Sequence, residues 1–350
     1  MSEVLNVGIV GTGIFAKERH LPSYQELSEK FKVVAAFNRT KSKAEEFAKL
    51  AGIANDKVYD NLDEILNDES VSYIDALLPV QFNADIVQKC IAAGKPIIME
   101  KPIAATMEQA RQIVKLSDST ELPVGVAENW LYLSCTDVVK SHLTEIGPIE
   151  AFTYNSTGPF VLHNKYLSTT WRQHPEHIGG FLSDGGVHQL ALLTDILGEI
   201  ESVSALTKQV RKQSGTDDIV FSTLKLRDSS VIGTFTYGSA FGSCEKSVFL
   251  KIYGLNGSIL LNVSNKKNPY VEVIVGGSAE ADAKTSRFEI SQEDSFGVNS
   301  EFLNFREAVL NKEKHLLKST PRKAFHHLAC VAAFLKSSSE NGNNVPVEQP

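Results

Sequence analysis

Strand and helix patterns alternate through the first 126 residues, and this alternation constrains the fold more than any other feature. The first unit is the apolar run VLNVGIV at residues 4–10, a glycine turn and a helical pattern that continues to about residue 29. Three more apolar strands are each followed by a helical segment, and a last strand closes the region, at residues 32–38, 73–80, 96–100 and 123–129. Near-continuously apolar strands in such an order predict an α/β fold, a doubly wound parallel sheet covered by helices on both faces.

The pattern changes after residue 126. Six strand-like segments follow, at residues 148–157, 200–210, 218–226, 230–239, 246–254 and 258–263. RDSS and LNGS stand between consecutive segments as hairpin turns. Helical patterns lie at 130–146, 185–198, 299–311 and 321–336. We therefore predict a nucleotide-binding domain at 1–126 and an α+β domain with a mostly antiparallel sheet at 127–338. The last helices of the second domain can pack on the first domain. Residues 339–350 are expected to form a partly ordered polar tail.

Length and composition narrow the class of protein. A chain of 350 residues is long for a single core, which favours two domains. The net charge of −7 disfavours a nucleic-acid partner, because such binding depends on basic surface. Four widely spaced cysteines favour a reducing compartment, and no apolar run is long enough to cross a bilayer. We expect a cytoplasmic protein with no membrane partner.

A glycine-rich turn joins the first strand to the first helix. Gly11, Gly13 and Ala16 have G-x-G-x-x-A spacing in the segment GIVGTGIFA. In this setting the first glycine permits a tight turn, the second lets backbone approach a pyrophosphate, and the small third residue lets helix and strand pack closely. The segment predicts dinucleotide binding.

The residues after the second strand bear on which dinucleotide is bound. Selectivity for NAD usually comes from a carboxylate that binds the ribose 2′-hydroxyl, whereas Asn38 stands here, followed by Arg39 and Thr40. Arginine holds a phosphate bidentately, and Ser42 and Lys43 add a hydroxyl and a second cation. The segment predicts NADP(H). The alternative is that Arg39 is a solvated loop residue that tolerates either cofactor.

A lysine ends the strand at 96–100, at the sheet edge where doubly wound folds bind ligands. Glu100, Lys101 and Pro102 stand at the carboxyl end of this strand. Pro102 fixes the chain direction after Lys101, and we predict a cis Lys101–Pro102 peptide bond. The alternative is an ordinary surface lysine.

A carboxylate and a histidine share one face of a later helical segment. Asp184 precedes His188 by four residues in GGFLSDGGVHQL. If a helix begins near residue 184, this spacing lets the carboxylate orient the imidazole, as an acid/base catalyst requires. The alternative is that Asp184 caps the helix and His188 is a core residue.

Taken together, these segments resemble the glucose-fructose oxidoreductase, inositol dehydrogenase and rhizopine-catabolism (Gfo/Idh/MocA) family over nearly the whole chain. The resemblance rests on six segments in order: GIVGTGIFA, EKPIA, AENW, the WR pair Trp171–Arg172, GGFLSDGGVHQL and EFLNFREAV. It implies an N-terminal Rossmann domain, a C-terminal domain with a large open sheet, and a substrate cleft between them.

The resemblance also implies roles for individual residues. Lys101 corresponds to the family's lysine that contacts the reacting oxygen, and Asp184 and His188 correspond to its catalytic pair. Substrate-binding positions are Asn129, Trp171 and Arg172. The cofactor-binding positions are Gly11, Thr12, Gly13, Ile14, Phe15, Asn38, Arg39, Thr40, Lys43, Pro79, Glu100 and Lys101.

Two positions depart from the family pattern and bear on the substrate class. Members often carry an aspartate three residues after the histidine, where Ala191 stands here, and Asp195 lies about 10 Å further along the helix. A frequent family histidine is replaced by Asn83.

The leading hypothesis is an NADP(H)-dependent oxidoreductase that transfers hydride to or from a small carbonyl or alcohol such as a sugar, polyol or aldehyde. One alternative is a non-catalytic, NADP-sensing regulatory protein of the same fold. Another is a metal enzyme that uses HPEH at 174–177, which Pro175 disfavours, so we predict no metal. Because exposed sheets are usually covered, we also expect a homo-oligomer through the C-terminal sheet.

Overall fold

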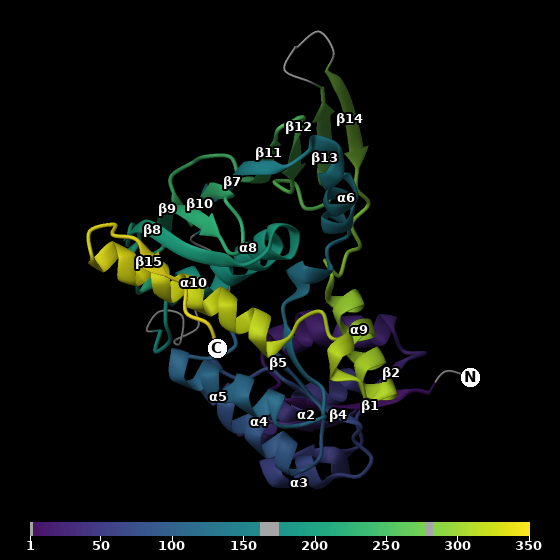
Figure 1. The fold of residues 1–350 in the computed structure, drawn as a ribbon. Helices are drawn as coiled ribbons and strands as arrows, with labels where there is room; N and C mark the ends of the chain where they lie inside the picture. Colours follow the sequence, from purple (N-terminus) through teal and green to yellow (C-terminus); the bar gives the residue numbers. More distant parts are fainter. Residues whose placement is uncertain (1–2, 162–174, 277–282) are drawn as a thin grey trace. The chain divides into compact units, whose positions relative to one another are not determined.

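The computed structural model describes residues 3–161, 175–276 and 283–350 (Figure 1). Its contacts define two compact units. The first comprises residues 1–129, 295–325 and 350, and the second comprises 130–294 and 326–349, within their described parts. Each unit is built around one sheet.

The first unit holds a six-stranded sheet with parallel pairs throughout, in the order β3-β2-β1-β4-β5-β6. This is the Rossmann strand order, and it confirms the predicted doubly wound sheet. The strands are β1 (Leu5–Val10), β2 (Phe31–Phe37), β3 (Val58–Tyr59), β4 (Tyr73–Ala76), β5 (Ile97–Glu100) and β6 (Val124–Ala127). The sequence analysis missed β3, because two residues are too few to show a period.

Helices of the first unit accompany these strands, and all but the last in the list connect one strand to the next. They are the short π-helix η1 (Ala16–His20), α1 (Leu21–Glu26), α2 (Lys41–Ala51), α3 (Leu62–Asn67), α4 (Asn83–Ala92), α5 (Met107–Asp118) and α9 (Val298–Asn311). Local signals set their ends: the Thr106 hydroxyl accepts a hydrogen bond from the Gln109 N–H at the start of α5, and Gly52 ends α2 in the left-handed conformation. Short 3-10 turns lie at Asn55–Lys57, Val80–Phe82, Asn129–Tyr132, Leu143–Ile146, Lys212–Ser214 and Lys314–Leu316.

Helix α9 completes the core of the first unit although it comes about 170 residues after β6 (Figure 1). Phe302 is fully buried, and its ring stacks on Tyr24 of α1 with centroids 4.3 Å apart. Phe305 lies against Gly125 of β6, where a side chain would crowd its ring. Truncating either phenylalanine to alanine would cost about 3–5 kcal/mol.

The second unit holds a sheet of nine described strands in the order β14-β13-β12-β11-β7-β10-β9-β8-β15. β7 and β10 are parallel and the other pairs are antiparallel, so the predicted mostly antiparallel sheet is confirmed. The strands are β7 (Ile149–Pro159), β8 (Ile200–Lys208), β9 (Ile219–Leu226), β10 (Ile232–Phe241), β11 (Ser247–Gly254), β12 (Gly257–Asn262), β13 (Tyr270–Val275), β14 (Lys284–Glu289) and β15 (Val345–Pro346). The expected turns RDSS and LNGS join β9 to β10 and β11 to β12.

The last residues differ from the expected polar tail. Val345 and Val347 are buried, and β15 pairs antiparallel with β8. A Ser337 hydroxyl accepts a hydrogen bond from Ala205 of β8 and donates one to the Asn343 carbonyl. These contacts attach the end of the chain to the sheet edge.

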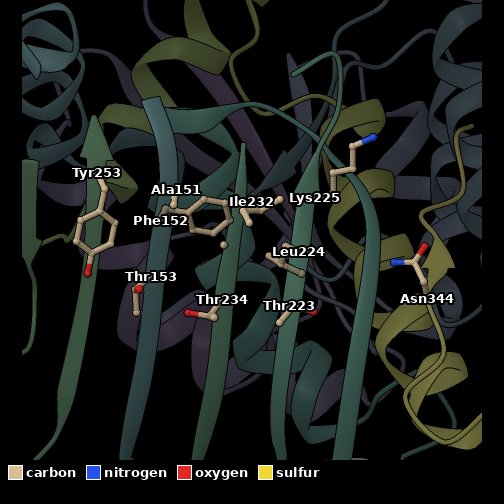
Figure 2. Close-up of a pocket in the computed structure, with 11 residues that line it drawn as sticks. Ala151, Phe152, Thr153, Thr223, Leu224, Lys225, Ile232, Thr234, Tyr253 and Asn344 are labelled. Atoms are coloured by element: carbon tan, nitrogen blue, oxygen red, sulfur yellow. The ribbon is translucent and has the colours of Figure 1, made fainter. Parts of the chain in front are cut away.

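Helices cover one face of this sheet: α6 (Ser134–His142), α8 (Phe181–Leu197) and α10 (Pro321–Ser339), of which α10 begins in the first unit. Phe334 of α10 stacks on Phe235 of β10, with ring centroids 5.5 Å apart. On the opposite face, Figure 2 shows Thr153, Thr234 and Thr223 on three adjacent strands, β7, β10 and β9. Large apolar side chains on this face are exposed, including Phe221 and Ile232, at 50% and 60%.

None of the helices in the described ranges combines the length and the apolar character that a membrane crossing needs.

Candidate active site

The glycine loop after β1 has the shape that a dinucleotide requires. Gly11 has φ of +99°, and a Cβ there would collide with the Leu77 carbonyl oxygen, so no other residue fits. A Cβ at Gly13 would meet no atom within 4 Å, so this backbone faces open space. Ala16 is fully buried. The loop is therefore tightly turned at Gly11 and open at Gly13, as the predicted pyrophosphate cradle requires, and Ile14 and Phe15 follow it in the chain.

The segment after β2 is tied to this loop. The Asn38 amide nitrogen donates to the Thr12 hydroxyl at 3.0 Å, and its amide oxygen accepts from the Thr40 N–H at 2.9 Å. Arg39 and Lys43 are exposed at the start of α2. Each polar atom of Asn38 is thus bonded within the protein, and the exposed Arg39 and Lys43 side chains follow it in the chain.

Lys101 follows β5 at the same carboxyl edge of the sheet. The Lys101–Pro102 bond is cis, as predicted. The Asn83 amide nitrogen donates to the carbonyl oxygens of Glu100, Pro102 and Ile103 at 3.0, 3.2 and 3.2 Å. Asn83, where the family often carries histidine, therefore holds the turn that bears the lysine. Pro79, just after β4, is exposed at this edge.

A buried ionic cluster is connected to this turn through Glu100. His20, the last residue of η1, lies 2.6 Å from the Asp75 carboxyl group through Nδ1 and 3.1 Å from the Glu100 carboxyl group through Nε2. Burial lowers the pKa of His20, but the attraction of Asp75 and the hydrogen bonds to both carboxyl groups outweigh it and raise the pKa to about 10. His20 is therefore an imidazolium at neutral pH.

Glu301 of α9 faces the same cluster. Burial and the charge of Glu100 raise the pKa of its carboxyl group well above the ordinary value. Its Oε1 atom is buried without a hydrogen-bond partner. Folding therefore favours the neutral form of the Glu301 carboxyl group.

The second unit carries Asp184 and His188 on α8, which begins at Phe181, three residues earlier than expected. Both side chains are partly exposed. The Trp130 ring stacks on His188, with centroids 5.7 Å apart and planes 19° apart, and Lys266 Nζ lies 5.8 Å from the centroid of the same indole. The indole thus fixes the plane of the imidazole.

The glycine pair between these two residues also has a packing role. Tyr237 of β10 packs against α8 where Gly185 and Gly186 expose the backbone, and a Cβ at Gly185 would overlap its hydroxyl. Burial and the charge of Asp184 raise the pKa of Tyr237. Ala191 is buried, and Asp195 forms a 2.7 Å ion pair with Lys140.

Of the other predicted positions, some lie within the described residues and some lie outside them. The Asn129 amide nitrogen donates to the Phe296 carbonyl oxygen at 2.7 Å within the first unit. Trp171 and Arg172 lie outside the described residues, as does His174 of HPEH. Within the described ranges, no group of three or more His, Cys, Asp and Glu side chains is arranged to hold a metal ion.

Sequence reasoning missed His20, Glu301, Trp130 and Tyr237. A histidine nine residues after Gly11, and an indole directly after Asn129, were visible in the motifs. Their partners lie far away in the sequence, so the motifs alone did not reveal the contacts.

A Rossmann unit that carries a glycine loop of the dinucleotide-binding type and a lysine at the same carboxyl edge of its sheet is typical of nucleotide-binding oxidoreductases. Residues 5–128 match the model of the oxidoreductase family NAD-binding Rossmann fold, and residues 140–348 match that of its C-terminal alpha/beta domain. The chain belongs to the Gfo/Idh/MocA oxidoreductase family.

Relatives and a solved structure agree with this membership. The chain is 67% identical over 346 residues to YMR315W of Saccharomyces cerevisiae, covering 99% of both proteins. It is 24% identical to scyllo-inositol 2-dehydrogenase (NADP(+)) IolW of Bacillus subtilis, over 73% of this chain and 70% of that one. The crystal structure of an oxidoreductase from Thermotoga maritima superposes with a TM-score of 0.85 at 32% identity, covering 99% of each chain.

Proposed function

We propose that this protein is an NADP(H)-dependent oxidoreductase acting on a CH–OH or C=O group of a small sugar, polyol or aldehyde in the cytoplasm. The observation that carries the proposal is the carboxyl edge of the first sheet. There the open glycine loop, the cationic segment Arg39–Lys43 and Lys101 follow strands β1, β2 and β5 of one parallel sheet. The name of the Bacillus subtilis relative, which includes both NADP(+) and a polyol, supports the cofactor and the substrate class.

The chemistry follows from the residue types. A bound nicotinamide supplies or accepts the hydride. The Lys101 ammonium stabilises negative charge as it develops on the reacting oxygen. His188 is the proposed acid/base group for proton transfer, with its ring plane set by Trp130, and Asp184 is the carboxylate proposed to orient it and stabilise its charged form. Removing such a stabilising cation would cost roughly 10²–10³ in rate.

The cofactor and substrate class are tested by initial rates of NADPH and NADH oxidation with a panel of aldehydes, ketones and keto sugars, beside binding titrations of both cofactors. We expect turnover with NADPH to exceed that with NADH by at least tenfold. Tight NADPH binding without turnover on any compound would overturn the proposal in favour of a regulatory protein. Equal rates with both cofactors would overturn the NADP selectivity alone.

We also propose that two copies associate through the open face of the second sheet. Phe221, Ile232 and Leu206 are at least half exposed on β9, β10 and β8; Phe221 pairs with Leu206 in the sheet, and Figure 2 shows Ile232 on the same face as the threonines. An apolar face of this kind is typical of an interface between subunits. Sedimentation should give a dimer for the native chain and a monomer for Ile232→Glu. The control Leu50→Glu, at an exposed leucine of α2, should remain dimeric.

A further inference from the structure

The cluster around His20 joins three elements beneath the turn that carries Lys101. His20 ends η1, Asp75 lies within β4 and Glu100 ends β5. His20 is 1% exposed and Asp75 is fully buried. A neutral imidazole has only one N–H donor, whereas here both ring nitrogens lie against carboxyl oxygens. The geometry therefore fits an imidazolium that donates to two carboxylates.

On the Nδ1 side of the imidazolium, core side chains hold its partner Asp75 in place. The Tyr24 hydroxyl donates to the same Asp75 oxygen at 2.9 Å, and the Tyr73 hydroxyl donates to Tyr24 at 3.0 Å. The His20 ring also packs edge-on against Phe302, with centroids 5.0 Å apart. His20 is thereby held in one place.

The Nε2 side of the imidazolium holds the carboxyl group of Glu100, whose side chain is 15% exposed. The backbone of the same turn is held independently, because Asn83 bonds the carbonyl oxygens on both sides of Lys101. Lys101 therefore follows Glu100, whose side chain is held by His20, in a turn whose backbone is held by Asn83.

Other titratable groups near the cluster do not replace His20. Glu301 and Glu128 face it with carboxyl groups, and Tyr24 and Tyr73 face it with phenols. Burial raises the pKa of both phenols, which therefore stay neutral near pH 7, and burial and Glu100 raise the pKa of Glu301, so none of the three groups supplies a positive charge. Loss of His20 would leave Asp75 and Glu100 without this counter-ion.

We propose that His20 is a positioning residue for Lys101, because its imidazolium anchors Glu100 to Asp75 and thereby fixes the turn that presents the lysine. The inference rests on the proposed function, in which Lys101 contacts the reacting oxygen. It assigns His20 a role in turnover and in the electrostatics of Lys101, beyond a contribution to stability.

The test compares His20→Gln with the native chain. Glutamine keeps one donor but carries no charge and cannot bridge both carboxyl groups. We expect kcat to fall about 30-fold or more, because small displacements of a catalytic group have effects of this size. The Kd for NADPH and the KM for the substrate should change much less than kcat, because His20 meets the glycine loop through an edge-on contact with Phe15, with ring centroids 5.4 Å apart, and glutamine leaves the loop backbone in place.

A second readout does not depend on turnover. Acetylation of Lys101 by acetic anhydride, followed across pH by mass spectrometry, reports where this lysine loses its proton. In His20→Gln the midpoint should move to higher pH, because Glu100 without its counter-ion favours the ammonium form. If the native chain turns over no compound, the proposed function fails, and the acetylation profile still decides the role of His20.

Two further variants separate positioning from stability. Asp68→Asn removes a buried carboxylate that binds Lys57 and Tyr59 ahead of β4, at the opposite edge of the same sheet, and should leave kcat and the Lys101 profile unchanged. Asp75→Asn removes the anchor of His20 and should reproduce the loss of kcat, which keeps the test decisive if His20→Gln does not fold. Unchanged kcat and an unchanged profile in a folded His20→Gln, or equal losses in Asp68→Asn, would overturn the proposal.

Discussion

At the residue scale, the proposed selectivity for NADPH rests on charges beside Asn38. The Asn38 amide is engaged by Thr12 and Thr40, so it links the glycine loop to the start of α2. Arg39 and Lys43 are exposed at the same place. A guanidinium recognises a phosphate with two parallel hydrogen bonds, and a neutral hydroxyl offers it much less.

We therefore predict that Arg39→Ala raises the Kd for NADPH by about 10- to 100-fold, the loss expected for hydrogen bonds to a charged group. The Kd for NADH should change by less than threefold. Fluorescence titration of both cofactors measures this, with Lys49→Ala on α2 as a control for general loss of positive charge. Equal weakening of both cofactors would contradict a phosphate-binding role.

Patterns in the sequence predicted the residues whose roles depend on local spacing. Gly11 and Gly13 were found from their position between a strand and a helix, and Asp184 and His188 from i,i+4 spacing. His20 was missed because its two partners lie 55 and 80 residues away, which no local pattern records. Only the fold brings these side chains together.

At the scale of elements, helix α8 depends on the absence of a side chain at Gly185. The ring of Tyr237 on β10 occupies the space that a Cβ would need. The segment DGGVH thus serves packing in addition to the catalytic role proposed for it, because its glycines let the strand approach the helix between Asp184 and His188. This purpose could not be read from the sequence, which shows the glycines but not the strand that meets them.

We predict that Gly185→Ala lowers the free energy of unfolding by roughly 1–3 kcal/mol, the usual cost of overpacking. Gly242→Ala, in the same unit but with no atom near its Cβ position, should change it by less than 0.5 kcal/mol, as surface substitutions usually do. Adding Tyr237→Phe should recover part of the loss, because it removes the overlapping hydroxyl. Urea unfolding measures all three, and equal stabilities for the two alanine variants would contradict the packing account.

Long, periodic elements were predictable and short ones were not. The strands of both sheets that span four residues or more were largely expected, apart from β13 and β14. β3 and β15 have two residues each, and their existence depends on neighbours in the sheet. The first helix was expected to be regular, whereas it opens with the π-helix η1 that places His20 against Asp75.

At the scale of the whole molecule, the ionic cluster makes stability depend on pH. Burial opposes the charge of His20, but Asp75 and Glu100 raise its pKa from 6.5 to about 10, and burial with Glu100 raises that of Glu301. A group whose pKa is raised by folding stabilises the folded state below its unfolded pKa, and this contribution is lost as the pH rises through the folded pKa.

We therefore predict that the thermal unfolding temperature falls as the pH rises from 6.5 to about 10. Glu301→Gln should become more stable than the native chain as the pH rises, because glutamine has no proton to lose, and His20→Gln should show a weaker slope over this range. Circular dichroism at constant ionic strength measures the effect. An unfolding temperature that rises over this range would contradict it.

Asp68→Asn provides the matched control, because Asp68 has the opposite effect on how stability changes with pH. Burial raises the pKa of Asp68, but hydrogen bonds from Ser70, Lys57 and Tyr59 lower it from 3.8 to about 2. Its stabilising effect is present above pH 3.8 and is lost as the pH falls through 2. The variant should flatten the acid side of the profile and leave the alkaline slope unchanged.

The central claim, hydride transfer assisted by Lys101, is tested most directly by single-turnover oxidation of NADPH with the best carbonyl substrate, comparing the native chain with Lys101→Met. Lys49→Met serves as the control for loss of a lysine. We predict a loss of rate of roughly 10²- to 10³-fold in Lys101→Met, with a Kd for NADPH that changes far less than the rate, and a native rate in the control. A native rate in Lys101→Met would contradict the claim.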